Sequence, residues 1–175
     1  LSYSNLTNAN LSGSILYAYL NNANFTGANL SNAYISGAIV SESNFTNANL
    51  AGANISNSGV QRSNFTGANL TGVNFTYANL AGAILLSANL NGVKSGSITG
   101  VPVQLPPGWR LINGYRVGPQ ADLTGANLAT FDLSGMNLSG AIMNNAVLTS
   151  TNFTRADLSQ VDIRKAGITG TVFLR

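Results

Sequence analysis

The fold is decided by a short stretch of the chain, residues 24–30, which reads Asn-Phe-Thr-Gly-Ala-Asn-Leu. It holds two apolar residues five positions apart, Phe25 and Leu30, and each follows an Asn. Outward from this stretch, every fifth residue from Leu20 to Leu90 is apolar. The residue two places before the apolar one is small in nearly every unit, so each five-residue unit carries one large and one small side chain at fixed positions.

The same unit occurs on both sides of this region. Toward the N-terminus it runs from Leu6 to Leu16, with a slip of one residue before Leu20. Toward the C-terminus it resumes at Leu123 and continues to Phe173. The central position is apolar in every one of these units, which marks the chain as a repeat protein.

A five-residue period fits neither an α-helix nor a flat β-strand, whose side-chain periods are about 3.6 and 2 residues. The chain must therefore turn a corner in each unit. The triplet Asn-Phe-Thr recurs at 24–26, 44–46 and 64–66, a spacing of twenty residues, so four units complete one circuit. These spacings predict an all-β, square-sectioned solenoid of about seven coils. The recurring Asn is expected to stack from coil to coil as an amide ladder.

The units Ala28-Asn29-Leu30-Ser31-Asn32 and Ala156-Asp157-Leu158-Ser159-Gln160 resemble the repeats of the pentapeptide-repeat family. The resemblance implies a right-handed quadrilateral β-helix with four pentapeptides per coil and with the central and small residues both inside. Three large residues at the small position predict wider or less regular coils toward the C-terminus: Phe131, Met136 and Val161. The residues expected to form the core are Leu20, Phe25, Leu30, Phe45, Leu50, Phe65, Leu70, Leu123, Leu128, Leu148 and Phe153.

The repeat divides the chain into a first block at 1–90, an insertion at 91–120 and a second block at 121–175, arranged as one continuous or two tandem solenoids. Three of the four prolines lie in residues 101–108, which predicts an extended connector. Asn113-Gly114 between β-forming residues predicts a hairpin with Ile112 opposite Tyr115. Neither end carries a polar capping helix, so we expect a segment of a larger chain or an end that docks on a neighbour.

The hairpin region supplies the candidate binding residues Trp109, Arg110, Tyr115 and Arg116, because Trp, Tyr and Arg are enriched at binding hot spots. Two other interpretations stay open: the hairpin covers a seam between the repeat blocks, or it is a nucleic-acid stacking platform. The frame from residues 98–100 to 118–119 resembles a Trp-bearing insertion of cyanobacterial pentapeptide-repeat proteins. The resemblance implies a cyanobacterial source and leaves cytoplasm, lumen and periplasm open.

Composition excludes several chemistries. The chain has no Cys and no His, which removes disulfides, thiolate or imidazole metal sites and Ser-His or Cys-His nucleophiles. We therefore expect no cofactor, no metal and no enzymatic activity. Four of the five acids occupy the slot that Asn usually fills, so they are interpreted as repeat variants: Asp122, Asp132, Asp157 and Asp162. No apolar run approaches the roughly 18 residues of a membrane-spanning segment.

Eight basic against five acidic residues give a net charge of +3. Some pentapeptide-repeat proteins protect DNA gyrase by resembling DNA, and this charge argues against DNA mimicry and topoisomerase modulation. The basic cluster Arg155, Arg164, Lys165 and Arg175 is small for DNA binding; Arg155 and Arg175 are expected to stack. The sequence thus predicts a non-catalytic structural and protein-interaction module with an unknown protein partner. The alternative is binding to ice or an envelope polymer, suggested by the threonine column Thr26, Thr46 and Thr66.

Overall fold

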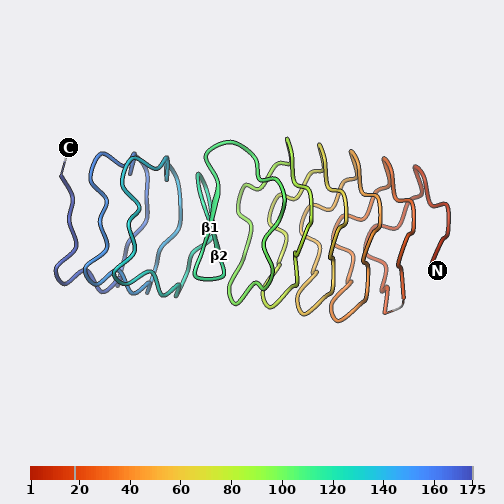
Figure 1. Ribbon diagram of the computed structural model, residues 1–175, viewed down its shortest axis with the longest axis horizontal. Coiled ribbons are helices and arrows are strands. Elements are labelled where there is room, and N and C mark those ends of the chain that lie inside the picture. Colours follow the sequence, from red (N-terminus) through yellow and green to blue (C-terminus); the bar gives the residue numbers. More distant parts are fainter. Residues whose placement is uncertain (18, 175) are drawn as a thin grey trace. The chain divides into compact units, whose positions relative to one another are not determined.

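The computed structural model describes residues 1–17 and 19–174 and divides into two compact units, Leu1–Pro107 and Gly108–Arg175. Ala18 and Arg175 lie outside the described residues, and so does the predicted stacking of Arg155 on Arg175. Within each unit, successive circuits of the chain lie side by side (Figure 1). In the part of the chain that is described there is no helix, and the named strands are β1 (Arg110–Ile112) and β2 (Tyr115–Val117).

Backbone hydrogen bonds between successive circuits hold each unit together. Asn24 forms a parallel bridge with Asn44, and Asn44 forms one with Asn64, so the partners are twenty residues apart. At the first of these bridges the Phe25 N–H donates to the Asn44 carbonyl at 2.7 Å, and the Asn44 N–H donates to the Ala23 carbonyl at 3.0 Å. Equivalent bridges recur every five residues, so each circuit contains four short extended segments.

The first circuit of the first unit is one residue shorter than the others. Asn10 pairs with Asn29 and Ile15 with Tyr34, an offset of nineteen residues, whereas Tyr19 pairs with Ile39 at the usual offset of twenty. The slip predicted between Leu16 and Leu20 is thereby confirmed. Leu16 and Leu20 on the two sides of the slip are both buried, so the inward positions stay in phase.

Each unit of the repeat ends in a turn whose third residue has a left-handed backbone. The Ala33 N–H donates to the Leu30 carbonyl at 3.0 Å, and Asn32 between them has φ of 56°. In the preceding unit the same position is Gly27, with φ of 64°. Gly and Asn adopt this region at low cost, which explains why they follow the apolar residue so often. Thr130 is a β-branched exception, with φ of 66°.

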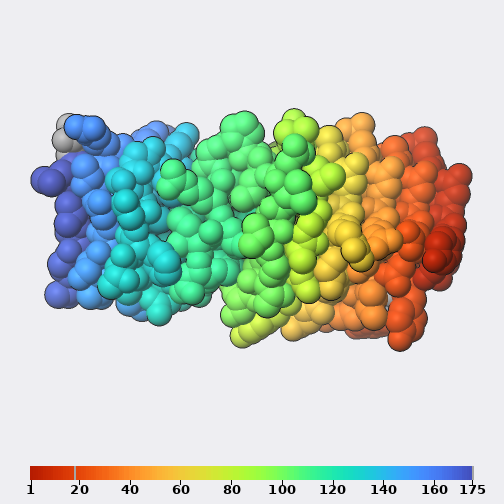
Figure 2. Space-filling model, viewed as in Figure 1, coloured from red at the N-terminus to blue at the C-terminus, as the bar shows by residue number. Residues whose placement is uncertain are grey.

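The interior is built from the large and small positions of the repeat. All of the residues expected in the core are buried, namely Leu20, Phe25, Leu30, Phe45, Leu50, Phe65, Leu70, Leu123, Leu128, Leu148 and Phe153. Burying each such side chain contributes about 1.5–3 kcal/mol, which offsets a backbone entropy cost of about 1–2 kcal/mol per residue. Side chains of neighbouring coils within each unit touch one another over the face seen in Figure 2.

Three phenylalanines stack along one inward column. The ring centroids of Phe25 and Phe45 are 4.7 Å apart and those of Phe45 and Phe65 are 4.9 Å apart, with interplanar angles of 4° and 5°. These separations match the spacing of about 4.8 Å between neighbouring β-segments. The backbone ladder therefore sets the stacking distance of the rings.

Buried hydroxyl groups replace Ala at some small positions without leaving polar atoms unsatisfied. Ser43 donates to the Leu20 carbonyl at 2.6 Å, and Ser63 donates to the Val40 carbonyl at 2.7 Å. Thr151 does the same with the Leu128 carbonyl at 2.7 Å in the second unit. Each acceptor belongs to the central residue of the preceding circuit, so the hydroxyl adds a further link between coils.

The outward Asn slot stabilises the turns. The Asn24 side-chain oxygen accepts hydrogen bonds from the Thr26 N–H at 3.1 Å and from the Thr26 hydroxyl at 2.6 Å. Amides also bond between coils: Asn49 donates to Asn29 at 3.3 Å, and Asn69 donates to Asn49 at 3.0 Å. The predicted amide ladder is thereby confirmed in this column.

The ladder of the first unit extends further than the apolar central positions indicate. Asn74 pairs with Lys94, Asn79 with Thr99 and Ile84 with Gln104, so residues beyond 90 still follow the coils. The central positions there are Ser95 and Gly100, yet Val93 and Ile98 at the small positions are large and buried. At Val93 and Ser95 the large and small residues have exchanged places, whereas Gly100 is exposed with φ of 71° and Ile98 is the buried residue of its unit.

The large residues at small positions in the second unit do not interrupt its ladder. Phe131 and Val161 are partly exposed and Met136 is buried. The bridges around them, such as Asp132 with Asn152, keep the offset of twenty residues. The expected loss of regularity is therefore absent from the register of these coils.

The inward assignment of Leu50 can be tested against an outward leucine of the same unit. Leu50 is fully buried, so Leu50→Ala should lower the free energy of unfolding by about 2–5 kcal/mol. Leu86 is 42% exposed, and Leu86→Ala should change stability by about 0.5 kcal/mol or less. Urea denaturation followed by circular dichroism measures both. Equal losses in the two variants would contradict the assignment.

The backbone strain at Thr130 gives a second test. Thr130 is exposed and has φ of 66°, a region that β-branched residues disfavour, so Thr130→Asn should raise the free energy of unfolding by about 1 kcal/mol. The matched control is Thr124→Asn, since Thr124 is also exposed and lies outside the left-handed positions. A gain of the same size in the control would show that turn strain is not the cause.

Candidate functional site

The predicted hairpin residues lie around a two-stranded antiparallel sheet. β1 and β2 pair in the register Arg110 with Val117, Leu111 with Arg116 and Ile112 with Tyr115. The connecting residues Asn113 and Gly114 have φ of 48° and 74°, as a type I′ turn requires. The register therefore sets which side chains face one another across the hairpin.

The structure separates the four candidate residues into a buried pair and an accessible pair. Trp109 is 9% exposed and Arg116 is fully buried, whereas Arg110 is exposed and Tyr115 is half-buried. Burial lowers the pKa of Arg116 to about 10, so its guanidinium remains protonated at neutral pH. Of the four, Arg110 and Tyr115 present side-chain surface to solvent.

Contacts within the second unit hold the hairpin in place. The Trp109 ring lies against the backbone of Gly118, where an added Cβ would approach the ring to 2.5 Å. The Asn113 side-chain amide donates to the Asn127 carbonyl at 3.1 Å. Trp109 is therefore a packing residue, and its close contact explains why position 118 is Gly.

The aspartates of the second unit occupy the Asn position of the repeat and accept the same backbone hydrogen bonds as Asn does. In each case the carboxylate accepts a hydrogen bond from the N–H two residues later in the chain. The distances are 3.0 Å for Asp132 with Ser134, 2.9 Å for Asp157 with Ser159 and 3.1 Å for Asp122 with Thr124. The interpretation of these acids as variants of the Asn slot is confirmed.

Hydrogen bonds from the turn lower the pKa of two of these carboxyl groups. Ser134 contributes most at Asp132, with smaller contributions from Asn152 and Arg110, and Ser159 does so at Asp157. At Asp162 the bonds from Arg164 hold the pKa well below its usual range. Arg164 pairs with Asp162 at 2.6 Å, which neutralises one cation of the predicted basic cluster. Among the described residues, no three His, Cys, Asp or Glu side chains lie close enough to hold a metal ion.

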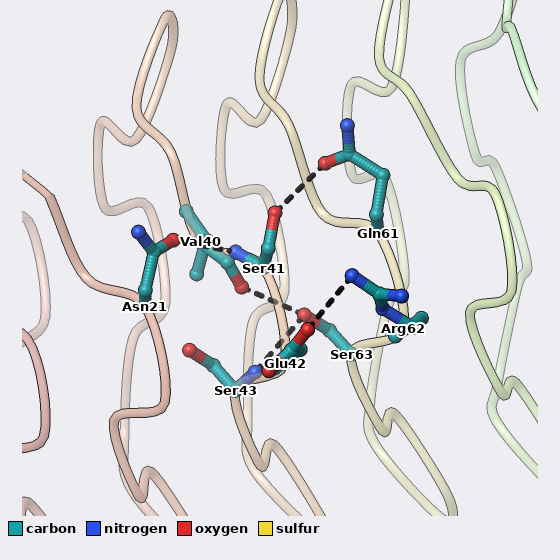
Figure 3. Close-up of polar contacts among 8 residues, drawn as sticks. All are labelled: Asn21, Val40, Ser41, Glu42, Ser43, Gln61, Arg62 and Ser63. Carbon is teal, nitrogen blue, oxygen red and sulfur yellow. Dashed lines mark hydrogen bonds and ion pairs between the residues drawn. The ribbon is translucent and has the colours of Figure 1, made fainter.

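A polar ladder on the first unit links three successive coils (Figure 3). The Ser41 N–H donates to the Asn21 side chain at 3.1 Å, and the Ser41 hydroxyl donates to Gln61 at 2.9 Å. Beside it, Arg62 and Glu42 form an exposed ion pair at 2.8 Å. Exposed ion pairs of this kind contribute about 0–1 kcal/mol to folding stability. The polar ladder therefore stabilises the protein little, and its role is to hold the three coils in register.

Five exposed aromatic and aliphatic residues gather near the shortened circuit. We name this surface the N-terminal tyrosine patch and define it as Ile15, Tyr17, Tyr19, Tyr34 and Ile39. Ile15 bridges to Tyr34, Tyr19 bridges to Ile39, and the rings of Tyr17 and Tyr34 meet edge to face at 5.4 Å. Sequence reasoning missed this patch, although the two tyrosines at the slip, Tyr17 and Tyr19, were a signal.

A family model for pentapeptide repeats matches residues 1–41, 28–67, 63–94 and 121–164, with eight copies. The chain belongs to the pentapeptide repeat family. No curated protein matches the chain at a significant level.

Solved pentapeptide repeat structures resemble the chain. One is HetL from the cyanobacterium Nostoc sp. strain PCC 7120, a protein involved in heterocyst differentiation regulation. It is 24% identical, the match covers 99% of this chain and 82% of HetL, and the TM-score is 0.35. A protein from the Arabidopsis thaliana thylakoid lumen is 26% identical over 59% and 68%, with a TM-score of 0.38. QnrB1, a plasmid-mediated fluoroquinolone resistance protein, is 21% identical over 95% and 78%, with a TM-score of 0.36.

The pentapeptide repeat leaves few side chains for other tasks. Its Asn and Asp residues cap turns, and the hydroxyls of Thr26, Thr46 and Thr66 each donate to a neighbouring Asn at 2.6 Å. In the described part of the chain no helix is long and apolar enough to cross a membrane. Two accessible surfaces in the described part of the chain depart from the repeat: the hairpin pair, Arg110 and Tyr115, and the N-terminal tyrosine patch.

The carboxylates of the second unit should make the free energy of unfolding depend on pH in the acid range. Their folded-state pKa values are lowered, so their stabilisation is present above the unfolded value near 3.9 and is lost as pH falls through the folded values. The free energy of unfolding should therefore decrease as the pH falls from about 5 to about 2.

The triple variant Asp132→Asn/Asp157→Asn/Asp162→Asn tests this expectation. Its amides keep the acceptor oxygens but do not titrate, so the decrease should be smaller. Urea denaturation at several pH values measures it, and an unchanged slope would contradict the assignment.

Proposed function

We propose that this pentapeptide repeat chain is a non-catalytic structural and protein-interaction module whose hairpin contacts a partner protein. One observation carries the proposal: Arg110 and Tyr115 are accessible on a hairpin that other contacts within the second unit hold in place. Trp109 packs on Gly118, and the Asn113 amide bonds to the second unit at 3.1 Å. Arg and Tyr are residue types enriched at binding hot spots, and an anchored hairpin loses little entropy when a partner binds.

The polar groups of the repeat support a non-catalytic role. A general acid or base needs a carboxyl group that can exchange a proton near the working pH. Asp132, Asp157 and Asp162 are instead held as carboxylates by bonds within their own turns, and the turns lower their pKa values. Their place in the outward slot of the repeat separates them from one another along the coils.

The scaffold that we propose for this role is a right-handed, four-sided β-helix. The supporting observations are the offset of twenty residues between bridge partners and the recurrence of bridges every five residues. The hairpin of β1 and β2 belongs to the second unit, where its contacts with Gly118 and Asn127 lie. A cyanobacterial source is likewise part of the proposal.

The surface chemistry argues against the alternatives. A net charge of +3 is the wrong sign for a DNA mimic that modulates a topoisomerase. The hydroxyl hydrogens of Thr26, Thr46 and Thr66 point to their own Asn side chains, which leaves oxygen acceptors alone for an ice or polymer surface. A protein partner at the hairpin is therefore the better-supported function.

Affinity capture from a cyanobacterial lysate tests the hairpin. The immobilised chain is compared with Arg110→Ala/Tyr115→Ala, which leaves the buried Trp109 and Arg116 intact. The matched control is Arg62→Ala/Tyr77→Ala, which removes the same residue types from exposed positions of the first unit. We expect a protein that the wild type and the control retain and the hairpin variant loses, with equal melting temperatures for all three. Equal retention by both variants, or retention of nothing, would contradict the proposal.

A further inference from the structure

The N-terminal tyrosine patch surrounds a cavity on the first unit. Tyr17, Tyr19, Gly37, Ala38 and Ile39 line a volume of about 330 Å³. This volume is at the lower end of the range of about 300–1,000 Å³ that small-molecule sites occupy. Tyr17 and Tyr19 come from the shortened circuit, and the other three residues come from the next one.

The floor of the cavity is small and its walls are aromatic. A Cβ added to Gly37 would meet nothing within 4 Å, so the space above this residue is open. Tyr17 and Tyr19 are each 68% exposed, a large fraction for aromatic side chains. The edge-to-face contact of Tyr17 with Tyr34, at 5.4 Å between ring centroids, fixes one wall.

None of the residues that line the cavity is charged, and the charged residue nearest to them along the chain is Glu42, which pairs with Arg62. Residues 1–41 contain no Asp, Glu, Lys or Arg. Desolvation raises the pKa of the Tyr17 phenol, and the neighbouring Tyr34 adds to the effect, so this phenol is neutral at physiological pH. Neutral amide and hydroxyl groups flank the patch along the chain at Asn21 and Ser36.

We propose that the N-terminal tyrosine patch binds an uncharged oligosaccharide, with a pyranose ring lying against the Tyr17 and Tyr19 rings. A pyranose has C–H groups that the negative face of an aromatic ring attracts. Its hydroxyl groups match the phenol groups of the patch and need no ionic partner. The site lies on the first unit, so the inference stands apart from the function proposed for the hairpin.

Other ligand classes fit the patch less well. A phosphate or a nucleotide would need cations, which none of the residues lining the cavity supplies. A second copy of the chain would need about 800 Å² of surface from each partner, supplied by about 20–30 residues. The patch offers five large side chains, so a small neutral ligand is the better match.

Calorimetric titration with cellohexaose, maltohexaose and chitohexaose tests the site. At least one of these probes should bind, and Tyr17→Ala and Tyr19→Ala should each weaken its binding about tenfold or more, equivalent to about 1.4 kcal/mol. The matched control is Tyr77→Ala, because Tyr77 is 61% exposed on the same unit but does not line the cavity. Its affinity should stay within about twofold of the wild type.

A second set of measurements separates the interpretations. Hexagalacturonate should bind more weakly than the neutral probes, because the patch offers no cation. The proposal is overturned if none of the three neutral probes binds, or if Tyr77→Ala loses as much affinity as Tyr17→Ala. It is also overturned if sedimentation shows a dimer that Tyr17→Ala/Tyr19→Ala dissociates, because the patch would then be a protein interface. Melting curves of all variants confirm that the chain is folded.

Discussion

The coils of this protein depend on the backbone hydrogen bonds between neighbouring circuits, whose bridge partners are twenty residues apart everywhere except in the shortened first circuit. Because each extended segment is a single bridge between two turns, the period of the side chains must equal the period of the turns. The large and small residues then have to face inward, and Asn has to follow the turn outward. The stacked phenylalanines at 4.7 and 4.9 Å are a consequence of this spacing.

The same constraint explains where function can reside. The side-chain oxygens of Asn24 and Asp132 accept hydrogen bonds from their own turns. The Ser43 hydroxyl donates to a carbonyl of the preceding coil. Both binding sites that we propose therefore lie where the repeat is broken. One such place is the hairpin of the second unit, and another is the shortened circuit beside Tyr17 and Tyr19.

The sequence was sufficient for the parts of the fold that repeat. The five-residue spacing indicated which side chains face inward, and the slip between Leu16 and Leu20 was visible in it. The burial of Arg116 could not be predicted, because the pairing of β1 and β2 does not say which side chains become covered. The tyrosine patch was missed because its residues belong to different circuits and meet only when the coils stack.

The exchange of large and small residues at Val93 and Ser95 has an evolutionary consequence. In this unit a large residue at the small position lies inside, where other units have a large central residue. We expect a Leu→Ser change at a central position alone to open a void, and a prior Ala→Val change at the small position to reduce its cost. The effect of each substitution then depends on the other, so the order in which they arise matters. Pattern searches keyed to the central residue will consequently undercount coils, as the family match ending at residue 94 shows beside a ladder that reaches Gln104.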